Sequence, residues 1–570
     1  MPKQKPQSCW TCRLRHKKCD ETRPACGQCA ALQISCIYSQ TKPRWMDSAP
    51  LKNQMIREIK SQVKTRARRR RFHGAIQEIE RKLQADVAGS DILSTPTDQS
   101  NGEDPVGEHE IQDSPQVLSN HVPLVNMGDD SDLHYIMIYI DYIFPIIFPF
   151  YRPSVLEGGR SWMFATFLNH ETMRCTTRAL AAHFLAIVPC QPTPVPLNCA
   201  SAAHVDGREQ TTSALRQLQE DLGALIERGP MTTPDDVLRE TKVLNGVVHM
   251  LNTEKIMSAE TWNLHLDPAI AQLGSILQSS IAHGTSSWAK VLNTLRMCAS
   301  ESMYPIWSAD QAAFRFSVGS LLVDDILASV SLETAPKLEP CWVDILGDNL
   351  SAPNPVNVNL EDLVGCQNWA MQGIGQVSSL AAWKKEMIRD GMLQRSEIKF
   401  RGSIIENRIR ERLVVFMETI PVNEPEASSF AIDTFTNKEI RKYSPTITQI
   451  WAHTALLFLQ VAVRGWLPSD YQVRESIAKL VNLFSELSDA PTVLHTLAFP
   501  LALAGCLSTG PNEGRFQTII KRMGALANLG AMKSMVKIVE NAWRNQDHVV
   551  AESQTMAACL NSLGYPVLLS

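Results

Sequence analysis

The sequence CWTCRLRHKKCDETRPACGQCAALQISC, residues 9–36, decides the fold of the N-terminal part. It holds six of the 14 cysteines of this 570-residue chain, whereas the other eight are scattered between positions 175 and 559. The spacing C-x2-C-x6-C-x6-C-x2-C-x6-C is one half-motif written twice. Because a C-x2-C pair lets two thiolates bind one tetrahedral zinc, the two pairs predict two zinc ions.

Ligand counting determines how two zinc ions share these sulfur atoms. Two tetrahedral ions need eight ligand positions, so six cysteines suffice only if two sulfurs bridge both ions. Nearby Lys and Arg residues favour the deprotonated thiolates that such a cluster needs. Both zincs are expected to be structural, because neither keeps an open coordination position. The predicted ligands are Cys9, Cys12, Cys19, Cys26, Cys29 and Cys36.

Three disulfides are the alternative interpretation of six clustered cysteines. They require an oxidising compartment. The N-terminus, Met-Pro-Lys-Gln-Lys-Pro, reaches the first cysteine without the apolar segment of a secretory signal, which indicates an intracellular protein. The sequence therefore favours zinc over disulfides.

The cysteine segment resembles the binuclear zinc cluster domain of fungal transcription factors. The likeness covers every cysteine, the Lys-Cys-Asp step and the proline before the fourth cysteine. This resemblance implies that Cys9 and Cys26 bridge the zincs. It implies two further ligand pairs, Cys12 with Cys19 and Cys29 with Cys36.

The cations between the second and third cysteines are candidates for DNA contact. We expect Arg13 to Lys18 to form a short helical turn whose cations point outward. The resemblance implies that this helix enters the major groove and reads a CGG-type triplet, with donors facing guanine O6 and N7. His16 departs from the lysine that many family members carry. A solvated charge run without a partner is the alternative. The predicted DNA-binding residues are Arg13, Arg15, His16, Lys17 and Lys18.

Charge is distributed unevenly along the chain. Residues 1–83 carry 20 Lys+Arg and 6 Asp+Glu, a balance of +14, which leaves -18 for residues 84–570. Such a split is typical of a basic nucleic-acid-binding end on an acidic body.

Residues 1–50 are interpreted as the zinc cluster DNA-binding domain, whose residues 37–50 form a linker. Residues 51–87 form a basic helical segment in which Met55, Ile59 and Val63 recur at helical intervals. The pattern does not sustain a heptad register, so a homodimer and a monomer both remain open. The densest cationic run predicts a nuclear localisation signal, with a merely solvated helix as the alternative. Its cations are Lys64, Arg66, Arg68, Arg69, Arg70 and Arg71.

Residues 88–132 are predicted to be an acidic, disordered linker. Eleven Asp and Glu residues lie between Asp86 and Asp132, whereas no Lys or Arg occurs from Leu83 to Tyr151. This segment is either an activation surface or a plain solubilising linker.

Residues 133–570 are predicted to form a large all-α domain. Leucines at 215, 218, 222 and 225 make one apolar stripe, and Val473 to Leu487 repeats the pattern. Ser444-Pro445 predicts a helix start and Gly465 its end. Strand-like alternation is limited to Val356–Leu360. Phe148–Tyr151 and Gly158–Trp162 resemble the opening of the helical regulatory domain of one group of fungal zinc cluster factors.

The body offers no sign of catalysis. It lacks the phosphate-binding, metalloprotease and nucleophile-elbow motifs, and Gly373-Ile-Gly375 is interpreted as helix or loop. His183 and His453 are interpreted as core histidines, Trp162, Trp451 and Trp543 as core aromatics, and Cys190 and Cys199 as free thiols.

The sequence therefore predicts a nuclear, zinc-dependent, DNA-binding transcription regulator of the RNA polymerase II type, not an enzyme. Its expected partners are double-stranded DNA and the transcription machinery or co-regulators, with no membrane. The alternative is an intracellular zinc-dependent scaffold that binds protein. Activation or repression, the target genes, the half-site arrangement and any effector are left undetermined.

Overall fold

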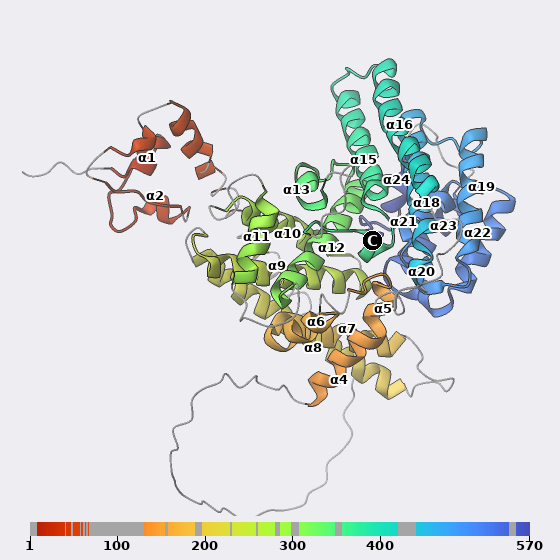
Figure 1. Cartoon of the computed structure of the whole chain (residues 1–570), viewed down its shortest axis with the longest axis horizontal. Coiled ribbons are helices and arrows are strands. Elements are labelled where there is room, and N and C mark those ends of the chain that lie inside the picture. The colour runs from red at the N-terminus through yellow and green to blue at the C-terminus, as the bar shows by residue number, and fades with distance from the viewer. Residues whose placement is uncertain are drawn as a thin grey trace, which may run out of the picture.

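The structure is a computed structural model of the whole chain (Figure 1). It describes two groups of residues, one in the N-terminal part and one in the remainder. They are 8–32, 34–39, 42–46, 49–57, 59–60, 63, 67 and 74, and then 130–153, 158–187, 197–227, 231–257, 260–279, 286–297, 307–347, 356–419, 440–545 and 554–570.

The N-terminal module is small and built around its cysteines. Its elements are α1 (Trp10–Leu14), α2 (Gly27–Ala30) and the 3-10 turn η1 (Arg44–Met46), and residues 49–57 and 59–60 are also helical. The turn η1 lies in the predicted linker, yet Trp45 and Met46 pack against the module's core. Part of that linker is therefore folded onto the module.

The helical body begins at Asp130, so the last residues assigned to the acidic linker belong to its first helix. Its first half consists of α4 (Asp130–Ile138), the π-helix η3 (Tyr139–Ile143), α5 (Phe144–Ile147), α6 (Ser161–Asn169), α7 (Glu171–Ile187), α8 (Leu197–Glu227), α9 (Pro234–Met257), α10 (Trp262–Leu277), α11 (Ser287–Met297) and α12 (Ala309–Leu332).

The second half of the body is also helical. It consists of η6 (Glu339–Cys341), α13 (Trp342–Leu346), α14 (Glu361–Val364), α15 (Asn368–Arg389), α16 (Arg395–Thr419), α18 (Ser444–Arg464), α19 (Tyr471–Glu486), α20 (Pro491–His495), α21 (Ala498–Cys506), α22 (Pro511–Arg522), η7 (Gly524–Asn528), α23 (Gly530–Arg544) and α24 (Met556–Leu560). The all-α prediction is confirmed: the described residues contain no strand.

Apolar stripes place these helices around one core. The four predicted leucines of α8 are all buried, as is the Val473-to-Leu487 stripe on α19. Helix α12 lies at the centre of the body (Figure 1), and nearly all of its side chains are buried. The predicted core tryptophans Trp162 and Trp451 are buried, and Trp543 packs partly buried against the same core.

Helix α18 is the one described helix that is long and apolar enough to cross a membrane. Its most apolar 18-residue stretch is 72% buried inside the body. It ends as predicted at Gly465, whose φ of 97° stops the helix. Its start differs from the prediction. The cap residue is Tyr443, and Ser444 is the first helical residue, so no side chain caps this end.

The segment from Val356 to Leu360, the one stretch with strand-like alternation, is an irregular loop, in agreement with the all-α class. Its alternation reflects burial on one side, because Val358 and Leu360 are both buried. A hydrogen bond from the Val358 N–H to the Ile345 carbonyl, at 2.9 Å, connects the loop to α13. Gly373-Ile-Gly375 lies within α15, so the helical interpretation is confirmed.

The last described segment completes the core. Val567, Leu568 and Leu569 are buried. The Trp262 Nε1–H of α10 donates to the Pro566 carbonyl at 2.8 Å, and Ser331 of α12 donates to the Val567 carbonyl. Residues more than three hundred positions apart therefore share one hydrogen-bonded contact.

Candidate metal centre and nucleic-acid interface

Each half-motif starts a short helix on its first cysteine. The Sγ of Cys9 accepts the Cys12 N–H at 3.2 Å, and the Sγ of Cys26 accepts the Cys29 N–H at 3.4 Å. A sulfur in the N-cap position thus replaces the usual Ser or Asp oxygen. The local fold follows from the C-x2-C spacing, because the cap and the next cysteine then lie on the same side of one turn.

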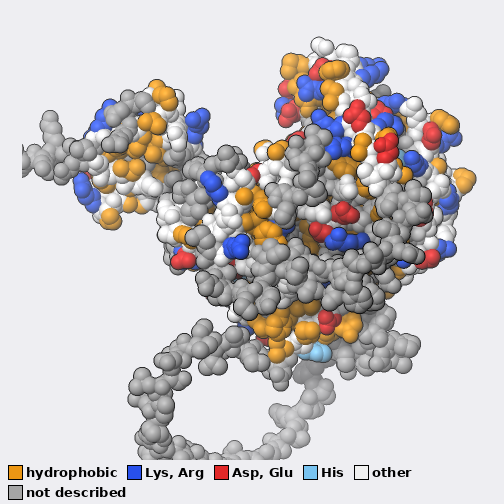
Figure 2. All heavy atoms as spheres, viewed as in Figure 1, with side chains coloured by type: hydrophobic (Ala, Val, Ile, Leu, Met, Phe, Trp, Pro, Cys, Tyr) orange, Lys and Arg blue, Asp and Glu red, His pale blue; other side chains and the backbone are white. Residues whose placement is uncertain are grey.

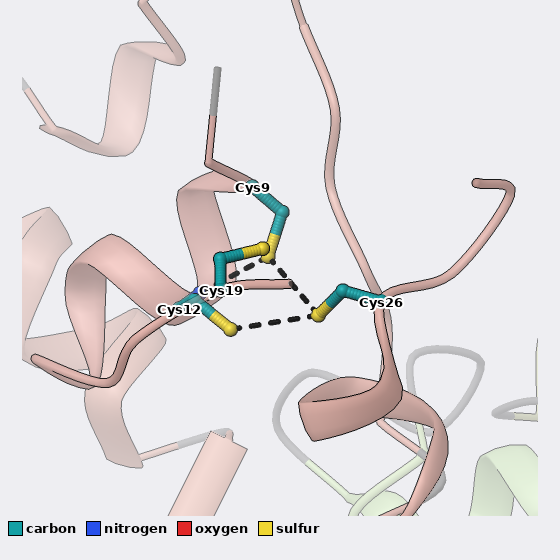
Figure 3. A group of neighbouring side chains, drawn as sticks. All are labelled: Cys9, Cys12, Cys19 and Cys26. Atoms are coloured by element: carbon teal, nitrogen blue, oxygen red, sulfur yellow. Dashed lines mark hydrogen bonds between the residues drawn. The ribbon is translucent and has the colours of Figure 1, made fainter. Parts of the chain in front are cut away.

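The six cysteine sulfurs form two groups of four that share two members. The first group is Cys9, Cys12, Cys19 and Cys26 (Figure 3), and the second is Cys9, Cys26, Cys29 and Cys36. Within each group, all sulfurs lie within 4.8 Å of one another. The structure therefore brings all six predicted ligands together.

The distances between sulfurs fit tetrahedral zinc. Cys9 and Cys26 are 3.8 Å apart, Cys12 and Cys26 are 3.5 Å apart, and Cys9 and Cys29 are 3.8 Å apart. Four sulfurs at 2.3 Å from one zinc are separated by about 3.8 Å. A disulfide bond would need about 2.05 Å, and all six cysteines are free, so the disulfide alternative does not fit.

Burial shapes the chemistry of these thiols. It raises the pKa of Cys9 and Cys29, so a metal must displace their protons when it binds. Burial also acts to raise the pKa of Cys26, but hydrogen bonds from the Cys29 backbone and from neighbouring thiols outweigh it and lower that pKa to about 6. The module therefore presents a thiolate at a position common to both groups.

Hydrogen bonds around the cysteines hold the two halves together. The Asp20 carboxylate accepts the Gly27 N–H at 2.9 Å, and a Cβ at Gly27 would lie only 2.5 Å from this carboxylate. Thr11 donates to the Ser35 carbonyl at 2.7 Å, and the Cys26 N–H donates to the Cys36 sulfur at 3.3 Å. These hydrogen bonds lie outside the set of metal ligands and orient the cysteines that form it.

The predicted reading helix is shorter and starts earlier than expected. It spans Trp10–Leu14, and the expected helical turn to Lys18 is not formed. His16 adopts a left-handed conformation with φ of 53°, and the Lys17 N–H donates back to the Cys12 carbonyl at 3.0 Å. This 6→1 bond closes the helix, so Lys17 and Lys18 follow it as an exposed, non-helical segment.

The five predicted DNA contacts differ in how freely they project. His16, Lys17 and Lys18 are exposed, whereas Arg15 is half-buried. Arg13 is exposed but already occupied, because its Nε donates to Ser8 at 2.9 Å and its guanidinium lies 4.7 Å from the centre of the Trp10 ring. Lys17 and Lys18 are thus the most available of the lysines and arginines at this site.

The two half-motifs are alike in backbone and unlike in charge. The segment after Cys12 holds five basic or imidazole side chains before Cys19, whereas the segment from Cys29 to Cys36 holds none. On the face shown in Figure 2, Lys and Arg side chains lie around the rim of the module, while the body mixes Lys and Arg with Asp and Glu. Only the first half-motif therefore presents cations.

One contact of the module was not anticipated from the sequence. Ile59 is buried in the cysteine core, and Met55, Ile56 and Val63 pack against it. The helical spacing of Met55, Ile59 and Val63 is a sequence pattern that left a homodimer and a monomer both open. The structure shows that these residues cover the module's own core.

Several predicted residues lie outside the described part of the chain. They include Cys190 and all six cations of the predicted localisation signal, namely Lys64, Arg66 and Arg68 to Arg71. In the body, His183 and His453 are half-buried, and burial lowers the pKa of His453 to about 4. Among the described residues, only the two cysteine groups could hold a metal ion.

Known proteins match the chain in both parts. The family described as fungal specific transcription factor domain matches residues 134–569, and the fungal Zn(2)-Cys(6) binuclear cluster domain matches residues 7–45. Transcription factor dibT of Pestalotiopsis microspora is 28% identical, covering 98% of both chains. The pestheic acid cluster transcriptional regulator 3 of Pestalotiopsis fici is 25% identical, over 89% of this chain and 88% of its own.

A third relative, the ustiloxin B cluster transcription factor ustR of Aspergillus flavus, is 25% identical over 95% of both chains. No solved structure is significantly similar. A Zn(2)-Cys(6) cluster binds two zinc ions, and the cysteine geometry fits them. The family consists of transcription regulators, not enzymes. The chain belongs to the fungal specific transcription factors that bind DNA through an N-terminal zinc cluster.

Proposed function

We propose that this protein recognises CGG-type triplets through the first half-motif and thereby regulates genes transcribed by RNA polymerase II. The observation that carries the proposal is the charge asymmetry between two structurally similar half-motifs. Each begins with a cysteine cap and a short helix, but exposed Lys17 and Lys18 follow only the first. Cationic donors suit guanine O6 and N7 in the major groove.

The same proposal assigns the metal ligands. Cys9 and Cys26, which belong to both sulfur groups, would bridge the two zincs. Cys12 and Cys19 would complete one site, and Cys29 and Cys36 the other. The ions would fix the start of α1 and the end of the cationic segment, since both flanking cysteines are ligands. Arg15 and His16 would add contacts to bases or phosphates, and Arg13 would support the helix through Trp10.

The test is selection of random duplex DNA by the zinc-loaded full chain. We expect enrichment of CGG-like triplets, and a weaker interaction with Lys17→Gln by about tenfold if the side chain contacts a base. Arg389→Gln, an exposed cation on α15, is the matched control and should leave binding unchanged. Binding without sequence enrichment would instead favour the protein-binding scaffold.

Nuclear import through the run from Lys64 to Arg71 is part of the proposal. It rests on six cations in eight positions. Changing Arg68, Arg69, Arg70 and Arg71 to alanine should move a fluorescently tagged chain from the nucleus to the cytoplasm. A tagged variant that stays nuclear would show that another segment carries the signal.

Dimerisation through residues 51–87 remains a prediction. Met55, Ile59 and Val63 are used within the module, so a dimer would depend on the later apolar residues Ile76, Ile79 and Leu83, which lie outside the described residues. Sedimentation of the full chain at micromolar concentration, with Ile79→Asp as the test variant, would decide between monomer and dimer.

The printed names of the relatives indicate a class of target genes. Two are named as regulators of the pestheic acid and ustiloxin B clusters, and others as trichothecene biosynthesis regulators. We therefore propose that this chain regulates a biosynthetic gene cluster. Deletion of its gene should change transcript levels of one group of neighbouring genes, and unchanged levels there would refute this assignment.

A further inference from the structure

A cavity lies where helices from both halves of the body meet. Its lining comes from α9 and α12, from α20 and α23, from the last residue, and from apolar residues of α14 and of the end of α5. The volume of the cavity, measured over the positions that the centre of a water molecule can take, is about 60 Å³. A single water needs roughly 10–15 Å³ on this measure, so the space suits a molecule of about five or six heavy atoms.

Most of the cavity wall is apolar, but two helices bring an ion pair to it. Lys255 of α9 donates to Asp324 Oδ1 of α12 at 2.7 Å, and Asp324 is only 1% exposed. Its other oxygen, Oδ2, is buried and has no hydrogen-bond partner among the described residues. A buried carboxylate oxygen without a donor is costly, so a hydrogen-bond donor brought to this oxygen would be stabilising.

A second acceptor comes from α20. The Nε2 of His495 is also buried and has no partner among the described residues. The other ring nitrogen bonds to the Leu529 backbone. Burial lowers the pKa of His495 to about 4, so the ring is neutral near pH 7 and Nε2 accepts a hydrogen bond. Ser320 also lines the cavity, but its hydroxyl is bonded to Asn252 at 3.1 Å.

We propose that this cavity binds a small neutral diol, or the diol end of a larger neutral molecule, whose hydroxyls donate to Asp324 Oδ2 and His495 Nε2. Lys255 and Asp324 already neutralise each other, so neither offers an unpaired charge to a charged ligand, whereas a neutral ligand needs none. A hydroxyl can also accept a hydrogen bond from the Lys255 ammonium while it donates to Asp324. The apolar wall contacts the ligand's carbon atoms.

The site would couple the two halves of the body. Its ligand would contact α9 and α12 on one side and α20 and α23 on the other, so binding would stabilise their packing. Gly530, at the start of α23, lies close to the backbone of Lys255 and Ile256, where an added Cβ would be 3.5 Å from both. The wall is therefore close-packed beside the cavity.

The experiment compares two isomers that differ in hydrogen-bond donors. The zinc-loaded full chain is titrated with 1,2-butanediol, which has two hydroxyls, and with 1,2-dimethoxyethane, which has none. Binding is followed by saturation-transfer NMR. We expect the diol to bind with a Kd about tenfold or more below that of the diether, because the diether cannot satisfy Asp324 or His495.

Two variants on different helices test the location. Ala531→Leu places a larger side chain in the cavity, and His495→Phe removes the acceptor while keeping an aromatic ring; both should weaken diol binding by about tenfold. Ala542→Leu, on α23 and away from the cavity, is the control. Thermal unfolding of each variant verifies that it is folded.

Three outcomes would overturn the proposal. Equal affinity for the two isomers would show that the acceptors do not select a donor. Diol binding unchanged in both Ala531→Leu and His495→Phe would place the binding elsewhere. Absence of diol binding at tens of millimolar would show that ordered water alone satisfies these groups. None of these results bears on DNA recognition, so the two proposals fail separately.

Discussion

In the N-terminal module, four of the seven buried core residues are cysteines, whereas the core of the body consists of aliphatic and aromatic side chains from nearly every helix. The module is too small to bury enough apolar surface to fold without metal. The body has such a core and contains no metal-ligand group among its described residues. One chain therefore uses two independent sources of stability, coordination bonds in the module and apolar burial in the body.

Metal removal should separate the two regions most clearly. Chelation of zinc, or Cys26→Ser, should unfold residues 9–36, abolish DNA binding and leave the thermal unfolding of the body unchanged, because coordination supplies on the order of 10 kcal/mol or more in such small modules. Amide hydrogen exchange would report the unfolding residue by residue. Cys341→Ser, at a half-buried body cysteine, is the matched control. Protected amides in the chelated module would contradict this view.

The converse experiment removes apolar burial from the body. Trp288 is fully buried, its ring stacks on Phe314 with centres 5.3 Å apart, and its Nε1–H donates to the Val356 carbonyl at 2.9 Å. Trp288→Ala should destabilise the body by about 3–5 kcal/mol. Zinc content should stay at two per chain. Tyr471→Ala, at a side chain 72% exposed, should change stability by less than about 0.5 kcal/mol in denaturant titrations.

The body should also respond to acid through buried histidines. Burial lowers the pKa of His249 to about 3, and His170 acts in the same direction. An unfolded histidine has a pKa near 6.5, so between about pH 6.5 and 3 the unfolded state binds more protons and stability falls as pH falls. His249→Gln should flatten this slope by up to about 1.4 kcal/mol per pH unit. Melting curves between pH 7.5 and 5 test it, with exposed His134→Gln as the control.

The smallest effect is expected at one helix start. The Asp236 carboxylate accepts the Thr232 and Thr233 N–H groups, while Thr233 Oγ1 accepts the Asp236 N–H at 3.2 Å. Burial acts to raise the pKa of Asp236, but these hydrogen bonds prevail and lower it to about 2. Asp236→Ala should cost about 0.5–1 kcal/mol, and exposed Asp235→Ala less. If the two variants melt alike, the cap does not contribute.

Patterns that depend on neighbouring residues were predictable, and contacts between distant ones were not. The C-x2-C spacing and the leucine stripe of α8 each follow from the geometry of one helical turn or of successive turns. By contrast, the burial of Ile59 against the cysteines depends on where the chain returns after η1. The lining of the cavity joins α9 to α23 across the whole body, which no local pattern encodes.

One sequence pattern has a cause other than a strand, and one prediction failed. The alternation in Val356–Leu360 is typical of a strand, but the described residues contain no strand, and this loop buries Val358 and Leu360. The helix expected to reach Lys18 ends at Leu14 because His16 is left-handed, a conformation that is uncommon at non-glycine residues although His adopts it more often than most.

The bond between Trp262 and Pro566 has a consequence for synthesis on the ribosome. Helix α10 emerges long before its partner, because 304 residues separate the two ends of this bond. At about 5–20 residues per second, the indole of Trp262 waits roughly 15–60 s for the carbonyl that satisfies it. During that interval the nascent body exposes the apolar surface that Val567, Leu568 and Leu569 later cover. Chaperones that bind apolar surfaces therefore have this interval in which to bind the nascent chain.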